Sequence, residues 1–286
     1  MILDGHIHIH SGKPDPAGFA AQLGQAGVAG GVVISQPPAT FLPGQDALAP
    51  RARLDNLFAW CASNAELYPF YWVDPIEEDA VEQVALAVER EVVGFKVICD
   101  RFYPGDPRAL PVFQAIARAG KPLLFHSGIL WDGKPSSVYN RPAGFEALLQ
   151  VDGLRFSLAH ISWPWCDELI AVYGKFLNAY TRRSDLAVEM FVDTTPGTPP
   201  IYRREALTKL FTVGYDVARN VFFGSDCTAN DYHVDWVRQW VERDREIFRE
   251  LELPSETVAG VLGENLRRFV GQSVEPVQKK KPRPAE

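Results

Sequence analysis

The chain has 286 residues, of which 47% are apolar, 12% aromatic and 23% charged, and this composition excludes a disordered or fibrous protein. Its 36 acidic and 29 basic residues give a formal net charge of -7, which argues against a general binder of nucleic acid or anionic membranes, because such binders need a basic face. The length allows either two domains or one α/β barrel of about 250 residues.

Short apolar runs rich in β-branched residues alternate along the chain with longer stretches at helical spacing. This alternation is typical of strand and helix units around a parallel sheet. We predict eight strands, at residues 2–9, 30–35, 69–74, 92–98, 122–127, 155–161, 187–193 and 220–225. We predict helices between and after them, at residues 15–27, 51–66, 77–90, 107–119, 141–150, 164–178, 203–214 and 232–250, with a short pair at 255–270.

Eight such units in one unbroken series predict an α/β protein with a single-domain (β/α)8 TIM barrel over residues 1–272. Right-handed crossovers favour closure of the sheet, and a doubly wound open sheet is the alternative. Residues 273–286 include the run Lys279-Lys280-Lys281-Pro282-Arg283-Pro284 and have no apolar periodicity. We expect them to form a short, flexible, disordered tail that is basic and rich in proline.

The first predicted strand places three histidines on one face. His6, His8 and His10 alternate with isoleucines, so the two-residue period of a strand points every imidazole the same way, into the barrel. Burial of several imidazoles is unfavourable unless their ring nitrogens have partners, and a divalent metal is one such partner. The alternative is an accidental histidine pair on a solvated edge strand.

Three further polar residues follow apolar strands. His126 and His160 end the fifth and sixth predicted strands, and Asp226 follows the eighth, where its alternative role is to cap the next helix. In a barrel all strand ends meet at one rim, where barrel enzymes build their sites. Histidines and an aspartate at this rim match a zinc-type ligand set with an open position. Asp193, near the end of the seventh strand, is expected to orient a ligand histidine.

These motifs together resemble the metal-dependent amidohydrolase superfamily. The chain is most similar to its amidohydrolase-2 (amidohydrolase-related) branch, which also contains the aminocarboxymuconate semialdehyde decarboxylase-like enzymes. The resemblance extends from about residue 2 to residue 270. It rests on Asp4-Gly5-His6-x-His8, Gly94-Phe95-Lys96, His126, His160, Gly224-Ser225-Asp226 and the closing Gly263-Glu264-Asn265-Leu266-Arg267-Arg268.

The resemblance implies that His6, His8, His126 and Asp226 hold one divalent metal ion, for which zinc is expected. It places His160 beside the metal, as a further ligand or as a catalytic base that stabilises charge on the substrate. Asp226 and His160 are therefore the expected catalytic residues, with Asp226 placed to orient water and to move its proton.

Lys96 has two interpretations in such a family. In one, the lysine is carboxylated and bridges a second metal ion; in the other, it is unmodified and contacts substrate or structure. Loop residues Arg101, Trp131 and Trp163 follow strands four to six and are candidates for substrate binding, since Arg101 could pair with a carboxylate and the indoles could stack on a planar ring. Packing of the loop layer is the alternative for all three.

The leading hypothesis is a metal-dependent hydrolase that cleaves an amide, lactone or related C–N or C–O bond of a small molecule. The alternative is a non-hydrolytic, metal-dependent decarboxylase of an unsaturated or aromatic carboxylic acid. A TatD-like nuclease ranks low, because that group carries a carboxylate ligand where this chain has Lys96. A barrel that has lost its metal and only binds ligand is disfavoured by the full set of histidines and Asp226.

Expectations for the environment of the protein follow from what the sequence lacks. No leader-like segment or apolar run of about 18 residues is present, and the four cysteines include no C-x-x-C pair. We expect a cytoplasmic protein that acts on a small molecule and binds neither nucleic acid nor membrane. A homodimer is compatible with the sequence.

Overall fold

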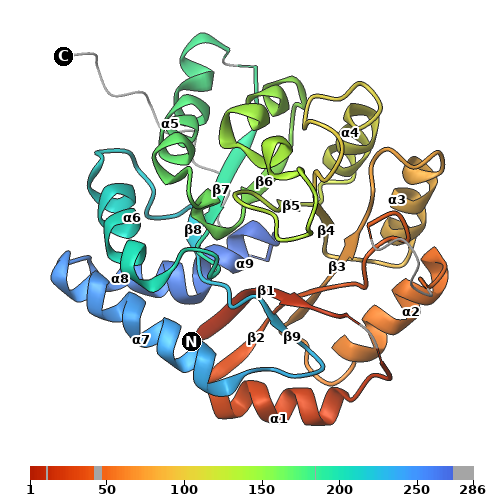
Figure 1. Cartoon of the computed structure of the whole chain (residues 1–286), viewed down its shortest axis with the longest axis horizontal. Coiled ribbons are helices and arrows are strands. Elements are labelled where there is room, and N and C mark those ends of the chain that lie inside the picture. Colours follow the sequence, from red (N-terminus) through yellow and green to blue (C-terminus); the bar gives the residue numbers. More distant parts are fainter. Residues whose placement is uncertain (11, 42–46, 184, 273–286) are drawn as a thin grey trace.

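The computed structural model describes residues 1–10, 12–41, 47–183 and 185–272. The chain folds as the predicted (β/α)8 barrel, with strands in the centre and helices around them (Figure 1). Each strand pairs in parallel with its neighbours in chain order. The first seven strands are β1 (Ile2–His8), β2 (Val28–Ile34), β3 (Leu67–Trp72), β4 (Gly94–Val97), β5 (Leu123–Phe125), β6 (Arg155–Leu158) and β7 (Glu189–Asp193).

The eighth strand consists of two short pieces that close the barrel. β8 (Val221–Phe222) pairs with β7, and β9 (Cys227–Thr228) pairs with β1. Between the pieces, the Gly5 amide donates to the Phe223 carbonyl at 2.8 Å, and the Asp226 amide donates to the His6 carbonyl at 3.0 Å. The prediction of one strand over 220–225 is corrected accordingly: the ladder with β7 ends at Phe222, and the chain then crosses to β1 and passes through Asp226, whose φ is 61°.

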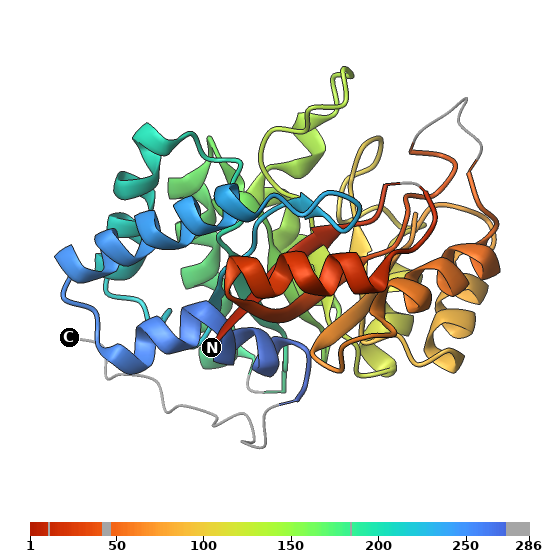
Figure 2. The same cartoon turned by 90° about the horizontal axis from the view of Figure 1, so that it is seen from below.

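The outer layer consists of helices that begin near the carboxyl ends of the strands (Figure 2). Several of them start with proline in the first turn, where no amide hydrogen is needed. The predicted helix at 141–150 is instead a 3₁₀ helix, η2 (Pro142–Gln150), which contains the poor helix former Gly144. The α-helices of this layer are α1 (Pro16–Ala26), α2 (Pro50–Cys61), α3 (Ala80–Glu89), α4 (Leu110–Arg118), α5 (Cys166–Arg182), α6 (Pro200–Thr212) and α7 (Val234–Glu250).

A final helical segment packs its apolar side chains into the interior of the barrel. It consists of α8 (Ser255–Ala259), the π-helical turn η4 (Gly260–Glu264) and α9 (Asn265–Phe269). The Phe269 ring lies 5.1 Å from the rings of Phe191 and Phe222. Within the described ranges, no helix combines the length and the hydrophobicity required to cross a membrane. The predicted tail at 273–286 lies outside the described residues.

Candidate metal centre

Four histidines and one aspartate meet at the carboxyl ends of the strands. His6 and His8 lie on β1, His126 and His160 follow β5 and β6, and Asp226 lies between β8 and β9. The ring centroids of His6 and His160 are 5.3 Å apart, and those of His126 and His160 are 4.8 Å apart. The structure therefore brings together the five residues that the sequence placed on one rim.

Ligand atoms of His6, His160 and Asp226 all lie within 4.8 Å of one another, a spacing that suits one metal ion. His8 borders this trio, with Nε2 3.1 Å from His6 Nε2 and 3.5 Å from Asp226 Oδ1. His126 points its Nε2 at the Ile129 carbonyl oxygen, 3.2 Å away. The geometry thus includes His160 directly among the candidate ligands, while His8 and His126 lie beside them.

A carboxylate fixes the orientation of the His6 ring. Asp193 Oδ2 lies 2.7 Å from His6 Nδ1, and Asp193 Oδ1 accepts from the backbone amide of Thr195 at 2.7 Å and from the Thr195 hydroxyl. With the Nδ1 proton donated to Asp193, His6 Nε2 carries a lone pair that faces the cluster. This arrangement is typical of metal-binding histidines and agrees with the role expected of Asp193.

The charges around the cluster also fit a cation. Burial lowers the pKa of His6 and of His126 well below the usual histidine range, and lowers the pKa of His160 to about 4. Although burial raises the pKa of Asp226, the hydrogen bond to His8 and the nearby His160 and Lys96 lower it to about 2. Neutral imidazoles and an ionised carboxylate are the forms that bind a divalent metal such as zinc.

Lys96 lies inside the barrel, fully buried on β4, with Nζ 3.3 Å from His6 Nε2. Burial lowers the pKa of Lys96, and the charges of Asp193 and Asp226 oppose that shift. The side chain therefore reaches the cluster, a position compatible with both interpretations of this lysine.

The backbone is strained where it presents His160 and Asp226. Their φ angles are 62° and 61°, and Ile161 and Ser162 after His160 are also positive, at 46° and 52°. Such angles are unfavourable by about 1–3 kcal/mol per non-glycine residue and concentrate at functional sites. The Ser127 hydroxyl donates to the Ala159 carbonyl at 2.7 Å and lies 2.6 Å from the Ser162 hydroxyl, so these serines stabilise the strained turn.

The three predicted substrate contacts differ in their surroundings. Arg101 pairs with Asp74 and, at 3.0 Å, with Asp100, so its charge is compensated by two carboxylates. The Trp131 side chain is 80% exposed. Trp163 packs near Tyr202, with ring centroids 6.0 Å apart. Their contacts with substrate remain predictions.

A cavity of about 370 Å³ borders Asp226, whose side chain is 39% exposed. Its lining includes Trp236 and His233, which the sequence did not single out as substrate contacts; their position at the start of the helix that follows the last strand was the available signal. The full lining is Pro196, Ser225, Asp226, Cys227, Thr228, Asp231, His233 and Trp236.

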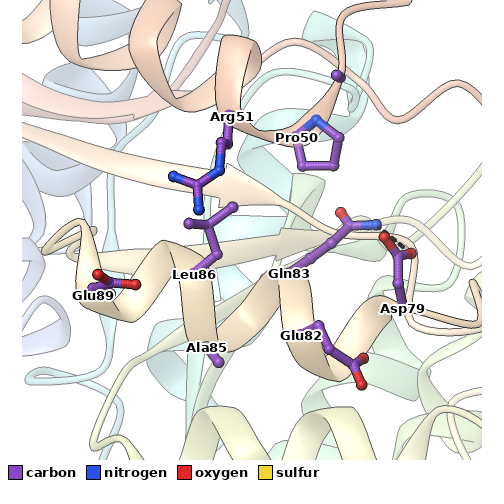
Figure 3. Close-up of a pocket in the computed structure, with 9 residues that line it drawn as sticks. Pro50, Arg51, Asp79, Glu82, Gln83, Ala85, Leu86 and Glu89 are labelled. Carbon is purple, nitrogen blue, oxygen red and sulfur yellow. Dashed lines mark hydrogen bonds between the residues drawn. The ribbon is translucent and has the colours of Figure 1, made fainter.

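A second cavity, of about 580 Å³, lies between the start of α2 and α3 (Figure 3). It is bordered by Arg51 and Leu86, and by Gln83, which donates a hydrogen bond to Asp79. Its position in the outer helical layer separates it from the strand ends, where barrel enzymes carry their chemistry.

Comparisons with known proteins give a family and a set of similar folds. A family model described as amidohydrolase matches residues 15–272. No curated protein matches the chain. At the identities below, the solved structures show a shared fold alone.

Three solved structures illustrate this similarity. A dihydroorotase from Campylobacter jejuni is 15% identical, with a TM-score of 0.59 over 96% of this chain and 84% of that one. A protein named amidohydrolase 2 from Bifidobacterium longum subsp. infantis is also 15% identical, with a TM-score of 0.59 over 95% and 99% of the two chains. A probable 2-pyrone-4,6-dicarboxylic acid hydrolase from Acinetobacter baumannii, with citric acid bound, is 12% identical, with a TM-score of 0.58 over 94% and 99%.

Proposed function

The chain belongs to the amidohydrolase family, and from that premise we propose that it cleaves an amide, lactone or related C–N or C–O bond of a small molecule by a metal-dependent hydrolysis. The observation that carries the proposal is the convergence of His6, His160 and Asp226 within 4.8 Å at the rim of the barrel. One protein with the same fold is named a probable 2-pyrone-4,6-dicarboxylic acid hydrolase, and another is named a dihydroorotase, which supports the proposal.

We propose one zinc ion held by His6, His160 and Asp226, with His8 and His126 as the further ligands that the family resemblance implies. A carboxylated Lys96 would add a second ion. A bound divalent cation lowers the pKa of its water to about 7 and so supplies a nucleophile at neutral pH.

Asp226 is placed to act as the base. Its carboxylate is ionised, partly exposed and at the edge of the 370 Å³ cavity, so it can accept the proton of the attacking water and return it to the leaving group. His160 Nδ1 lies 3.3 Å from the Pro196 carbonyl oxygen. A proton donated there leaves the other ring nitrogen as an acceptor, which favours a ligand or base role for His160 over donation to a substrate carbonyl.

The decarboxylase alternative receives less support from the cavity. A carboxylic acid substrate needs a cationic partner, whereas the residues that line the 370 Å³ cavity include Asp226 and Asp231 and neither lysine nor arginine. Arg101 on the rim is already paired with Asp74 and Asp100. The proposed metal ion and the unmodified Lys96 ammonium would then be the cationic partners for a substrate carboxylate.

A product assay tests the proposal. Zinc-loaded protein is incubated with panels of lactones, amides and aromatic or unsaturated acids, and products are identified by mass spectrometry with and without a chelator. We expect hydrolysis products that disappear on chelation and return with zinc. Release of carbon dioxide without hydrolysis would establish the decarboxylase instead, and hydrolysis insensitive to chelation would contradict the metal-dependent mechanism.

A further inference from the structure

Asp4 is a buried carboxylate with three hydrogen-bond donors around it. Its Oδ1 accepts from the backbone amides of His6, at 3.0 Å, and Ser225, at 2.9 Å, and its Oδ2 accepts from the Tyr232 hydroxyl at 2.7 Å. The side chain is fully inaccessible to solvent. A buried carboxylate surrounded by donors in this way is held in one orientation.

The two amides come from opposite sides of the seam that closes the barrel. His6 lies in an irregularity of β1, where the register with β2 shifts between Asp4 and Ile7. Ser225 lies between β8 and β9 and directly precedes Asp226. Neither amide is part of a regular ladder at this point, so a single oxygen of Asp4 joins the backbones that carry two of the candidate metal ligands.

The two backbones are in close contact across the seam. A Cβ atom on Gly5 would lie 2.5 Å from the Phe222 ring and 2.9 Å from the Phe223 carbonyl oxygen. The absence of a side chain at residue 5 therefore lets β1 approach the eighth strand closely enough for Asp4 to bridge both chains.

Tyr232 approaches Asp4 from the segment that precedes α7. Its side chain is 1% exposed, and its ring packs against Phe19 of α1, with centroids 5.8 Å apart and an interplanar angle of 66°. Packing fixes the ring, and the hydroxyl then fixes the free oxygen of Asp4.

We propose that Tyr232 is a positioning residue of the metal centre, which acts through Asp4 to hold the backbones of His6 and Asp226 at the separation that a metal ion requires. The inference rests on the proposed metal-dependent function. Residues that orient metal ligands through hydrogen bonds typically change metal affinity by about 10- to 100-fold when substituted.

The test compares Tyr232→Phe with Tyr71→Phe, which also removes a buried hydroxyl. The Tyr71 hydroxyl, on β3, donates to Oε1 of Gln83 on α3 at 2.8 Å. Zinc affinity is measured by competition with a chromophoric chelator, ligand geometry by the visible spectrum of the cobalt-loaded protein, and stability by thermal unfolding of the metal-free form. We expect Tyr232→Phe to weaken zinc binding by about 10-fold and to alter the cobalt spectrum, and Tyr71→Phe to change neither.

Two results would overturn the proposal. The first is that Tyr232→Phe leaves both the zinc affinity and the cobalt spectrum unchanged. The second is that Tyr232→Phe loses zinc affinity only in proportion to its loss of thermal stability, while the cobalt spectrum stays the same. If the wild-type protein itself binds no zinc, the proposed function fails before Tyr232 is tested.

Asp4→Asn provides an independent variant. If Tyr232 acts through Asp4, the double variant binds zinc as weakly as Asp4→Asn alone, because residues in one pathway are not additive. Losses that add in full would show that Tyr232 acts by another route and would overturn the proposal.

Discussion

Replacement of Asp193 by asparagine tests the proposed orientation of His6. One oxygen of the Asp193 carboxylate accepts a hydrogen bond from His6 Nδ1, at 2.7 Å, and the other accepts from the Thr195 amide, also at 2.7 Å. Asparagine retains only one acceptor oxygen. If that oxygen stays with Thr195, the new amide group donates to His6 Nδ1, which moves the ring proton to Nε2 and removes the lone pair that faces the cluster. If the side-chain amide is flipped instead, its oxygen accepts from His6 Nδ1, but its NH₂ group then faces the Thr195 amide and hydroxyl, which are also donors.

Either orientation of the asparagine weakens the metal centre. Loss of a carboxylate that orients a ligand histidine lowers metal affinity by about 10- to 100-fold, which corresponds to about 1.4 to 2.7 kcal/mol of binding free energy. Chelator competition at neutral pH measures the change. Asp55→Asn is the matched control, because Asp55 is a surface carboxylate that pairs with Arg90 at 2.7 Å. Equal zinc affinity in Asp193→Asn and in the wild type would refute the assigned role of Asp193.

Three further predictions concern turnover, pH and stability. Asp226→Asn should abolish hydrolysis with an unchanged circular dichroism spectrum, because the base is lost while the apolar core is intact; near-normal turnover would rule out Asp226 as the base. In the metal-free protein, His160 has its pKa lowered to about 4, so the unfolded state binds the extra proton below about pH 6.5. Stability should therefore fall by about 3 kcal/mol in total as pH falls from 6.5 to 4. Urea unfolding of His160→Gln should show a fall in stability with pH that is smaller by this amount. If the free energy of unfolding of the two proteins fell in parallel with pH, the lowered pKa of His160 would be wrong. Arg203→Ala should lower the free energy of unfolding by about 3–5 kcal/mol, because Asp244, fully buried and 2.6 Å from Arg203, loses its partner. Replacement of the exposed neighbour Arg204 by alanine should change the free energy of unfolding by less than about 0.5 kcal/mol. An equally small effect of Arg203→Ala would show that the buried ion pair adds little to stability.

The regular part of the fold is readable from the sequence. Short apolar runs rich in β-branched residues, alternating with stretches at helical spacing, predicted the eight units and the barrel. The eighth strand was misjudged because its break depends on tertiary contacts. A Cβ on Gly224 would lie 2.9 Å from His6 Cβ, and Asp226 adopts φ of 61°. Neither feature has a local signature in the chain.

The residues of the candidate site were easier to predict than their arrangement. Strand parity and strand ends indicated His6, His160 and Asp226, since every strand of a barrel ends at the same rim. The hydrogen bonds that orient them join residues far apart in the chain, such as the 228 positions between Asp4 and Tyr232. A single sequence carries no signal for such pairs, so Tyr232 emerges only from the fold.

Metal analysis of the purified protein tests the central claim most directly. Inductively coupled plasma mass spectrometry of gently purified protein should find about one divalent ion per chain, with zinc expected. His6→Ala should remove that ion while the Arg204→Ala surface variant retains it. The claim of a metal-dependent hydrolase would be contradicted if the folded wild-type protein bound less than about one equivalent of zinc after reconstitution and still hydrolysed its substrate.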